Sequence, residues 1–312
     1  MKLAFVFPGQ GSQAVGMLDS FAQNAAVQEA VKTADEALGE DLSGLIHNGP
    51  AESLNLTINT QPALLTASVG MYNAWLAAGG VKPEVMAGHS LGEYSALTAA
   101  GVFPLEEAVK LVRFRAKVMQ EAVPVGVGGM AAIIGLPDEA VFEVCREAAS
   151  VGAVEAVNFN SPGQVVIAGL KAAVEKACEL AKARGAKRAL MLAVSAPFHS
   201  SLMKPASDAL REKLAGVAMN EPAVDVVANI DVKVHRDVGE IREALASQAA
   251  GAVQWVKTVR YFKEIGVTHV IECGPGRVLA GLIKRTESGI EIRNVNSEES
   301  LQKVLEEINA LA

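Results

Sequence analysis

The chain has 312 residues, of which 50% are hydrophobic, and its formal net charge is −7. A chain of this size and composition can bury a large core and is expected to form more than one lobe. The acidic balance argues against general nucleic-acid binding, because a basic face supplies most of the affinity of such proteins.

The cysteines and the first residues bear on where the protein works. Cys145, Cys178 and Cys273 are scattered and have no C-x-x-C spacing, a pattern typical of a reduced cytoplasm and of a protein without a structural metal. The first apolar run stops at Pro8, which is too short for a signal peptide or a membrane span. We therefore expect a cytoplasmic protein that does not enter a membrane. No apolar stripe demands a dimer, so we expect a monomer.

Apolar strands alternate with helices in the first part of the chain. Strands are predicted over residues 3–7 and 85–89, and helices over residues 61–79, 91–101 and 105–122. Such alternation is typical of a mainly parallel sheet that is covered on both faces.

The pattern changes at the Pro/Gly-rich segment PVGVGG, residues 124–129. Beyond it, strand, helix, strand, strand, helix and strand are predicted over residues 130–136, 137–149, 156–160, 164–169, 171–185 and 187–194. This order is that of the split βαβ, or ferredoxin-like, fold. We therefore predict a small lobe of residues 124–195, inserted in a large lobe of residues 1–123 and 196–312. The large lobe resumes with elements over residues 268–276, 277–286, 290–295 and 298–311.

The stretch Gly88-His89-Ser90-Leu91-Gly92 matches G-x-S-x-G, between an apolar run and a helical pattern. In this setting a sharp strand-to-helix turn exposes the serine hydroxyl, and the glycines avoid a collision there. The start of the helix also offers free N–H groups to developing negative charge. We interpret Ser90 as a nucleophile, and the alternative is a serine that only caps the helix.

A serine nucleophile needs a base, and the chain has five histidines. His199 follows a predicted strand and Pro197, so it lies on a loop at the carboxyl ends of strands, where α/β sites form. The others are less suitable. His89 adjoins the serine and His47 ends a helix, whereas His235 lies in a surface turn and His269 starts a strand. The residues alone leave His199 as either a base or a hydrogen-bonded loop residue. No acid stands out as a third member, so an amide or a backbone carbonyl could orient the imidazole.

Arg113 and Arg115 lie on opposite faces of the helix predicted over residues 105–122. Arg115 shares its face with apolar residues, namely Ala108, Leu111, Val112, Val118, Met119 and Ala122. A buried guanidinium needs an anion, because leaving its charge unpaired is costly. A buried acid such as Glu93 could supply it, but we favour an anion that arrives with a substrate.

The loop FPGQGSQAVGM, residues 7–17, invites comparison with phosphate-binding loops. Gly9 and Gly11 lack the third glycine of a dinucleotide motif, and Met17 stands where a P-loop requires lysine. Both nucleotide interpretations therefore fail. The loop could instead bring a backbone N–H near the serine as half of an oxyanion hole, or it could be a plain tight turn.

Seven segments together resemble the malonyl-CoA:acyl carrier protein transacylases, and the resemblance runs nearly end to end. They are FPGQGSQ, TQPALLTAS, AGHSLGEYSAL, FRAKVMQEAVP, NFNSPGQVVIAG, LMKPA and GPGRVL, in the order of that family. None is specific alone, but the set is highly specific. The resemblance implies an α/β fold, with a large α/β-hydrolase-like lobe that carries the serine and a small inserted ferredoxin-like lobe.

The resemblance also assigns roles in the chemistry. Ser90 would be the nucleophile and His199 its base. The backbone N–H groups of Gln10 and Leu91 would form the oxyanion hole. Gln248 would orient the imidazole through its carbonyl.

Five further residues would bind or select the substrate. Arg115 would take the malonyl carboxylate with two parallel hydrogen bonds, which answers why a cation lies in an apolar stripe. Gln61, His89 and Asn160 would support the pocket. Phe198 would favour malonyl groups by crowding a branched α-carbon, as its counterparts do in polyketide acyltransferases.

The implied function is transfer of a malonyl group from malonyl-CoA to the phosphopantetheine thiol of acyl carrier protein in fatty acid biosynthesis, with no permanently bound cofactor. A trans-acting acyltransferase of a polyketide pathway, a serine hydrolase or thioesterase, and a non-catalytic acyl-binding protein are the alternatives. Lys187, Arg188, Lys284 and Arg285 could meet an anionic ligand, although the sequence does not show that they cluster.

Overall fold

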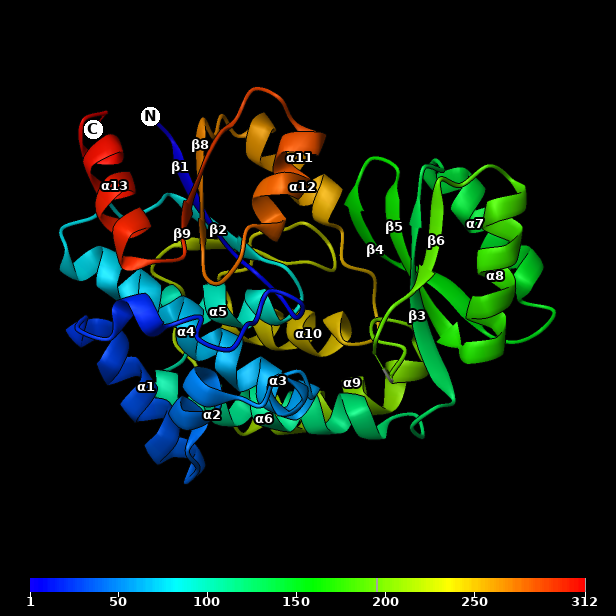
Figure 1. The fold of residues 1–312 in the computed structure, drawn as a ribbon, viewed down its shortest axis with the longest axis horizontal. Helices are drawn as coiled ribbons and strands as arrows, with labels where there is room; N and C mark the ends of the chain where they lie inside the picture. The colour runs from blue at the N-terminus through cyan, green and yellow to red at the C-terminus, as the bar shows by residue number, and fades with distance from the viewer. Residues whose placement is uncertain (195, 312) are drawn as a thin grey trace.

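The computed structural model describes residues 1–194 and 196–311, which form two lobes with one sheet each (Figure 1). The large sheet has the order β7-β2-β1-β8-β9, and all of its strand pairs are parallel. Its strands are β1 (Leu3–Phe7), β2 (Val85–Gly88), β7 (Asp225–Val227), β8 (His269–Cys273) and β9 (Glu291–Val295). The predicted α/β fold with a mainly parallel sheet is confirmed.

Helices cover both faces of the large sheet, which explains why its central strand is apolar throughout. Successive side chains of β1 point to opposite faces: Leu3, Phe5 and Phe7 pack in one core cluster, and Ala4 and Val6 in another. The first cluster lies under α1 (Ala25–Leu38), α2 (Leu42–Asn48), α3 (Ala51–Leu54), α4 (Thr57–Ala77), α5 (Leu91–Ala99), α6 (Leu105–Glu121), α9 (Lys204–Ala215), α10 (Val238–Gln248) and α13 (Glu298–Asn309). The second lies under α11 (Trp255–Glu264) and α12 (Val278–Thr286).

The small lobe is built from β3 (Gly128–Ile134), α7 (Asp138–Ala148), β4 (Val154–Ser161), β5 (Gln164–Leu170), α8 (Lys171–Ala183) and β6 (Arg188–Met191). Its antiparallel sheet has the order β4-β5-β3-β6, and α7 and α8 pack on a core of their own (Figure 1). The predicted succession of ferredoxin-like elements is confirmed. The exact boundaries at residues 124 and 195 stay a prediction, and Ser195 lies outside the described residues.

Strand β4 attaches the small lobe to the large one. Val253 in the loop before α11 donates its N–H to the carbonyl of Val157 at 2.8 Å, and its carbonyl accepts the N–H of Phe159 at 3.0 Å. This backbone pairing fixes the end of β4 beside the large lobe. Within the described residues, no helix combines the length and apolar character needed to cross a bilayer.

The glycines around the turn between β2 and α5 let three backbone segments approach closely. A Cβ on Gly88 would overlap the carbonyl of Gly92, and a Cβ on Gly92 would overlap the carbonyl of Phe7 in β1. Because these obstacles are backbone atoms, a larger side chain could be accommodated only by shifting α5 away from the sheet.

We predict that Gly92→Ala destabilises the protein by about 2–3 kcal/mol, because the added methyl group forces α5 off β1. Gly216→Ala is the matched control, because the nearest atom to its Cβ, the carbonyl oxygen of Lys213, is 3.7 Å away. Chemical denaturation measures both variants. Equal stability of the two variants would contradict the close approach.

Candidate active site

Ser90 sits on a strained turn between β2 and α5. Its φ of 54° and ψ of −111° are rare for a residue with a side chain. Two hydrogen bonds of Asn229 support this turn: its Oδ1 accepts the N–H of Ser90 at 2.7 Å, and its Nδ2 donates to the carbonyl of Gly88 at 2.6 Å. The fold therefore holds the hydroxyl of Ser90 above the start of the helix.

Ser90 and His199 are in direct contact, although 109 residues separate them in the chain. Ser90 Oγ lies 2.7 Å from His199 Nε2, and His199 Nδ1 lies 2.8 Å from the backbone carbonyl of Gln248. A carbonyl only accepts, so Nδ1 carries the proton and Nε2 is free to accept one from the serine. The arrangement can therefore serve as a nucleophile and base without a carboxylate.

Burial keeps the imidazole in its neutral, basic form. Only 4% of His199 is exposed. Desolvation, with the positive charge of Arg115 as a second cause, lowers the pKa of His199 from 6.5 to about 3. His199 is thus available as a proton acceptor at neutral pH.

Arg115 projects from α6 into the same cluster and is 1% exposed. Its Nη2 donates to Ser90 Oγ at 3.2 Å and to Gln248 Oε1 at 2.8 Å, and its Nη1 donates to Gln61 Oε1 at 2.7 Å. Its Nε is buried and finds no hydrogen-bond partner among the described residues. Arg115 therefore faces the serine hydroxyl, and its Nε–H remains available to a further acceptor.

The described residues contain no carboxylate in an ion pair with Arg115. Glu93 approaches it only through an amide: Glu93 Oε2 accepts from Gln248 Nε2 at 2.6 Å, and Gln248 Oε1 accepts from Arg115. Burial raises the pKa of Glu93 to about 8, against the opposing effects of hydrogen bonds from the N–H of Asn229 and from Gln248 and of the charge of Arg115. The alternative of a permanent salt bridge to Glu93 is thus not what the structure contains.

A chain of side-chain hydrogen bonds connects Arg115 with the glycine loop after β1. Gln61 Nε2 donates to Thr57 Oγ1 at 2.9 Å, and Thr57 Oγ1 donates to Gln10 Oε1 at 2.8 Å. These bonds fix the Gln61 amide with its oxygen toward the guanidinium. Leu91 begins α5, so its N–H has no carbonyl one turn earlier in the helix and remains available to an acceptor.

The family comparison agrees with this geometry. A family model described as an acyl transferase domain matches residues 4–305. The chain is 54% identical to the malonyl CoA-acyl carrier protein transacylase of Escherichia coli K12 over 98% of this chain and 99% of that protein. An acyl-carrier-protein S-malonyltransferase from Burkholderia pseudomallei superposes with a TM-score of 0.97 at 60% identity, over 98% of this chain and 100% of that one.

The chain belongs to the malonyl CoA-acyl carrier protein transacylase family. It is therefore an acyltransferase. A further transacylase of known structure, solved in complex with a type II polyketide synthase acyl-carrier protein, has a TM-score of 0.97 at 50% identity and covers 98% of this chain and 100% of its own.

His89 and Asn160 join the two lobes of this transacylase at the site. His89 Nε2 donates to Asn160 Oδ1, the two atoms being 2.7 Å apart, and the His89 ring packs on Trp255. Desolvation lowers the pKa of His89, so the ring is neutral. This hydrogen bond links the residue that follows β2 to β4 of the small lobe.

Phe198 precedes His199 in the chain and lies between the two lobes. It packs partly buried against the cores of both lobes. It also lines a pocket of about 340 Å³, together with Gln10, Leu56, Thr57, Gln120, Leu192, Ala193 and Val194. The predicted selectivity residue thus shares a pocket with Gln10 of the glycine loop.

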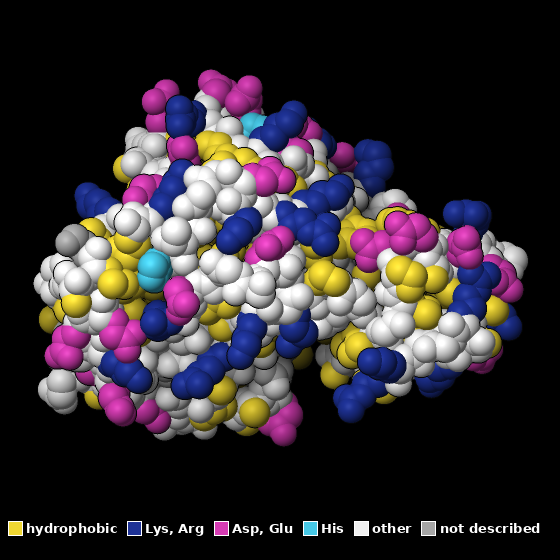
Figure 2. Space-filling model, turned by 90° about the horizontal axis from the view of Figure 1, so that it is seen from above, with side chains coloured by type: hydrophobic (Ala, Val, Ile, Leu, Met, Phe, Trp, Pro, Cys, Tyr) yellow, Lys and Arg dark blue, Asp and Glu magenta, His cyan; other side chains and the backbone are white. Residues whose placement is uncertain are grey.

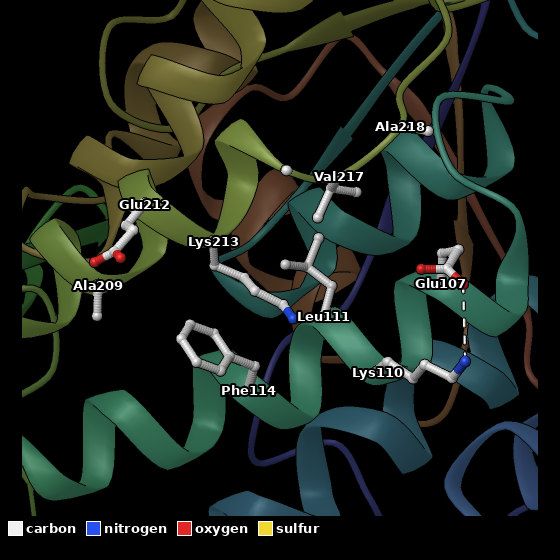
Figure 3. A pocket seen from close by; sticks show the side chains of 10 residues that line it. Glu107, Lys110, Leu111, Phe114, Ala209, Glu212, Lys213, Val217 and Ala218 are labelled. Carbon is white, nitrogen blue, oxygen red and sulfur yellow. Dashed lines mark ion pairs between the residues drawn. The ribbon is translucent and has the colours of Figure 1, made fainter.

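A larger groove of about 750 Å³ lies elsewhere, between α6 and α9 (Figure 3). Figure 3 shows the Lys213 side chain in this groove, and its ammonium lies 5.4 Å from the centroid of the Phe114 ring. None of the predicted site residues lines this groove. Size alone therefore does not locate the chemistry.

Thr57 and Asn229 were not predicted as residues of the site, and neither was the contact of Glu93 with Gln248. Thr57 precedes the predicted helix by one turn, and Asn229 lies just after the short strand β7, outside any motif. Its position near the carboxyl end of a strand is the one available signal. The described residues include no group of His, Cys, Asp or Glu suited to hold a metal.

We predict that the reactivity of Ser90 persists well below the ordinary histidine pKa of 6.5, because burial lowers the pKa of His199 to about 3. His199 stays neutral above its lowered pKa, so the base is retained as pH falls. The rate of reaction with a neutral fluorophosphonate should stay level from about pH 8 to about pH 5. A midpoint near 6.5 would contradict the desolvated imidazole.

Proposed function

We propose that this chain transfers the malonyl group of malonyl-CoA to the phosphopantetheine thiol of acyl carrier protein, in fatty acid biosynthesis. The observation that carries the proposal is Arg115: a buried guanidinium without an acid partner in the described residues, 3.2 Å from Ser90 Oγ. A malonyl thioester supplies what this site lacks, namely a carboxylate attached to an acyl group. Malonyl-CoA and the carrier are substrates, and no permanently bound cofactor is needed.

The proposed reaction has two steps through a malonyl-serine ester. His199 Nε2 takes the proton of Ser90 Oγ as that oxygen attacks the thioester carbonyl. The oxyanion is stabilised by the N–H groups of Gln10 and Leu91. The C–S bond then breaks, and the leaving thiolate of CoA takes the proton from His199.

The second step repeats the first with a different nucleophile. The phosphopantetheine thiol gives its proton to His199 and attacks the ester carbonyl, and Ser90 leaves and is reprotonated by His199. Gln248 orients the imidazole through its carbonyl, 2.8 Å from Nδ1. Phe198, which shares a pocket with Gln10, would crowd branched acyl groups, and Gln61, His89 and Asn160 would support the pocket walls.

A carboxylate-binding role for Arg115 can be tested against the second arginine of α6. Arg113 pairs in bidentate fashion with Glu40, at 2.8 and 2.9 Å, and so has its anion already. We predict that Arg115→Ala lowers the rate of malonyl loading by about a hundredfold, and acetyl loading by less than about threefold. Arg113→Ala is the control and should change neither rate.

Intact mass after mixing with malonyl-CoA or acetyl-CoA measures both reactions. Ser90→Ala should give no adduct with either. Equal losses for malonyl and acetyl groups in Arg115→Ala would count against carboxylate binding. Rapid release of malonate in the absence of carrier protein would favour the hydrolase alternative, although the relatives named above are all transferases.

Basic side chains from both lobes meet at one rim and support a docking role. Arg188 lies opposite Ile134 in the small sheet, Ile134 lies opposite Gln164, and Gln164 Oε1 accepts from Arg285 Nη2 at 3.4 Å. Lys187 and Lys284 adjoin these arginines and are exposed. Figure 2, seen from the side of α11 and α12, shows Lys and Arg side chains gathered where the large lobe borders the small one. An acyl carrier protein with an acidic surface suits this rim.

We predict that Arg188→Ala with Arg285→Ala slows malonyl transfer from the enzyme to acyl carrier protein by about tenfold at low salt. Transfer to free pantetheine, which lacks the protein surface, should be unchanged. Arg236→Ala is the control, because Arg236 is exposed and pairs with Asp225 elsewhere in the large lobe. If transfer to both acceptors falls equally, the rim does not act in docking.

We also propose where the protein works, its oligomeric state and the bounds of its lobes. A reduced cytoplasmic setting is supported by the three cysteines, which are all free and buried. One relative was solved with a polyketide carrier, but the comparisons as a whole do not favour the polyketide alternative for this chain. The protein is proposed to be a monomer, with a small lobe of residues 124–195 inserted in the large lobe.

A further inference from the structure

Glu93 is a buried acid that the proposed reaction does not use. It lies in the first turn of α5 and is 2% exposed. Both of its carboxyl oxygens accept hydrogen bonds: Oε1 from the N–H of Asn229 at 3.1 Å, and Oε2 from Gln248 Nε2 at 2.6 Å. Each oxygen retains a lone pair for its donor whether the group is ionised or protonated.

The Gln248 carboxamide is held between acceptors on one side and a cation on the other. Its Nε2 faces the carbonyl of Ser90 at 2.9 Å, Glu93 Oε2 at 2.6 Å and, less closely, Asn229 Oδ1 at 3.4 Å. Its Oε1 faces Arg115 Nη2 at 2.8 Å. Turned by half a rotation, the amide would set its oxygen against acceptors and its NH₂ against the guanidinium.

We propose that Glu93 is a positioning residue for substrate selection: it sets the orientation of the Gln248 amide, and the amide oxygen in turn aims Arg115 at the acyl group on Ser90. Glu93 touches neither the substrate nor the reacting atoms. It acts by allowing only one of the two orientations of the Gln248 amide. The inference rests on the proposed function, because it assigns Arg115 to the malonyl carboxylate.

A glutamine in place of Glu93 cannot do the same, although it has nearly the same shape. Its oxygen would accept from the N–H of Asn229, which leaves its NH₂ opposite the NH₂ of Gln248 at the distance of a hydrogen bond. Two donors facing each other in a buried site are costly. Relief comes from turning one amide over, and turning Gln248 places its NH₂ against Arg115.

The test compares Glu93→Gln with Glu93→Met by measuring kcat/KM for malonyl-CoA and for acetyl-CoA. We expect Glu93→Gln to lower the malonyl-to-acetyl ratio by about tenfold to a hundredfold, through KM for malonyl-CoA. Methionine brings no donor, and the carbonyl of Ser90 still holds Gln248, so Glu93→Met should lower the ratio less. A role in filling space alone predicts the reverse order, with the isosteric glutamine closest to wild type.

Glu272→Gln is the matched control. Glu272 is also fully buried and also accepts several hydrogen bonds, from the N–H groups of Leu279 and Ala280 and from Asn294, but it has no path to Arg115. Its variant should lose stability while keeping the wild-type malonyl-to-acetyl ratio. The control thus separates the effect of a destabilised core from the effect of a changed orientation of the Arg115 guanidinium.

The outcomes distinguish this inference from the proposed function. If wild-type enzyme acquires no malonyl group from malonyl-CoA, the proposed function fails. If wild type is loaded and Glu93→Gln keeps its ratio, only the role of Glu93 is overturned. Should Glu93→Gln not fold, an unchanged ratio in Glu93→Met overturns the role as well.

Discussion

The site depends on one constraint: a permanently charged guanidinium is buried, and no carboxylate of the described residues forms an ion pair with it. Arg115 is buried, and its hydrogen bonds go to two amide oxygens and one hydroxyl. Neutral acceptors partly compensate desolvation but do not cancel the charge. The same charge helps to keep His199 neutral and therefore basic. Selection of the acyl group and activation of the serine thus share one electrostatic cause.

The polar residues around Arg115 form one continuous network rather than separate pairs. From Gln10 it runs through Thr57 and Gln61 to Arg115, and then through Gln248 to Glu93. Gln61 and Gln248 each have their amide orientation fixed by a partner on the side away from Arg115. Such networks are stable only when every member is satisfied, so the loop after β1, α4, α5, α6 and α10 must all be in place before the pocket exists.

Much of this structure could be predicted from sequence, because strong local patterns carry it. Neighbouring residues are enough to predict the apolar strand β1, the G-x-S-x-G turn and the position of Arg115 on the apolar face of its helix. The helix predicted from residue 61 begins at Thr57 instead. Thr57 and Thr60 of its first turn are buried, and the helix continues although Pro62 costs it a hydrogen bond. Asn229 lies in no motif, and its contact with Ser90 joins residues more than a hundred positions apart. The same is true of the contact between Glu93 and Gln248, so only the folded chain reveals these two interactions.

The two glutamines that flank Arg115 limit how this pocket can be redesigned. Replacing the arginine by an apolar residue, to admit uncharged extender units, would strand two carbonyl oxygens that now accept from it. Those orphaned acceptors would draw in water, and water competes with a thiol for an ester. An enzyme engineer would therefore need to exchange Gln61, Arg115 and Gln248 as a set, while preserving the main-chain oxygen of the last for the imidazole.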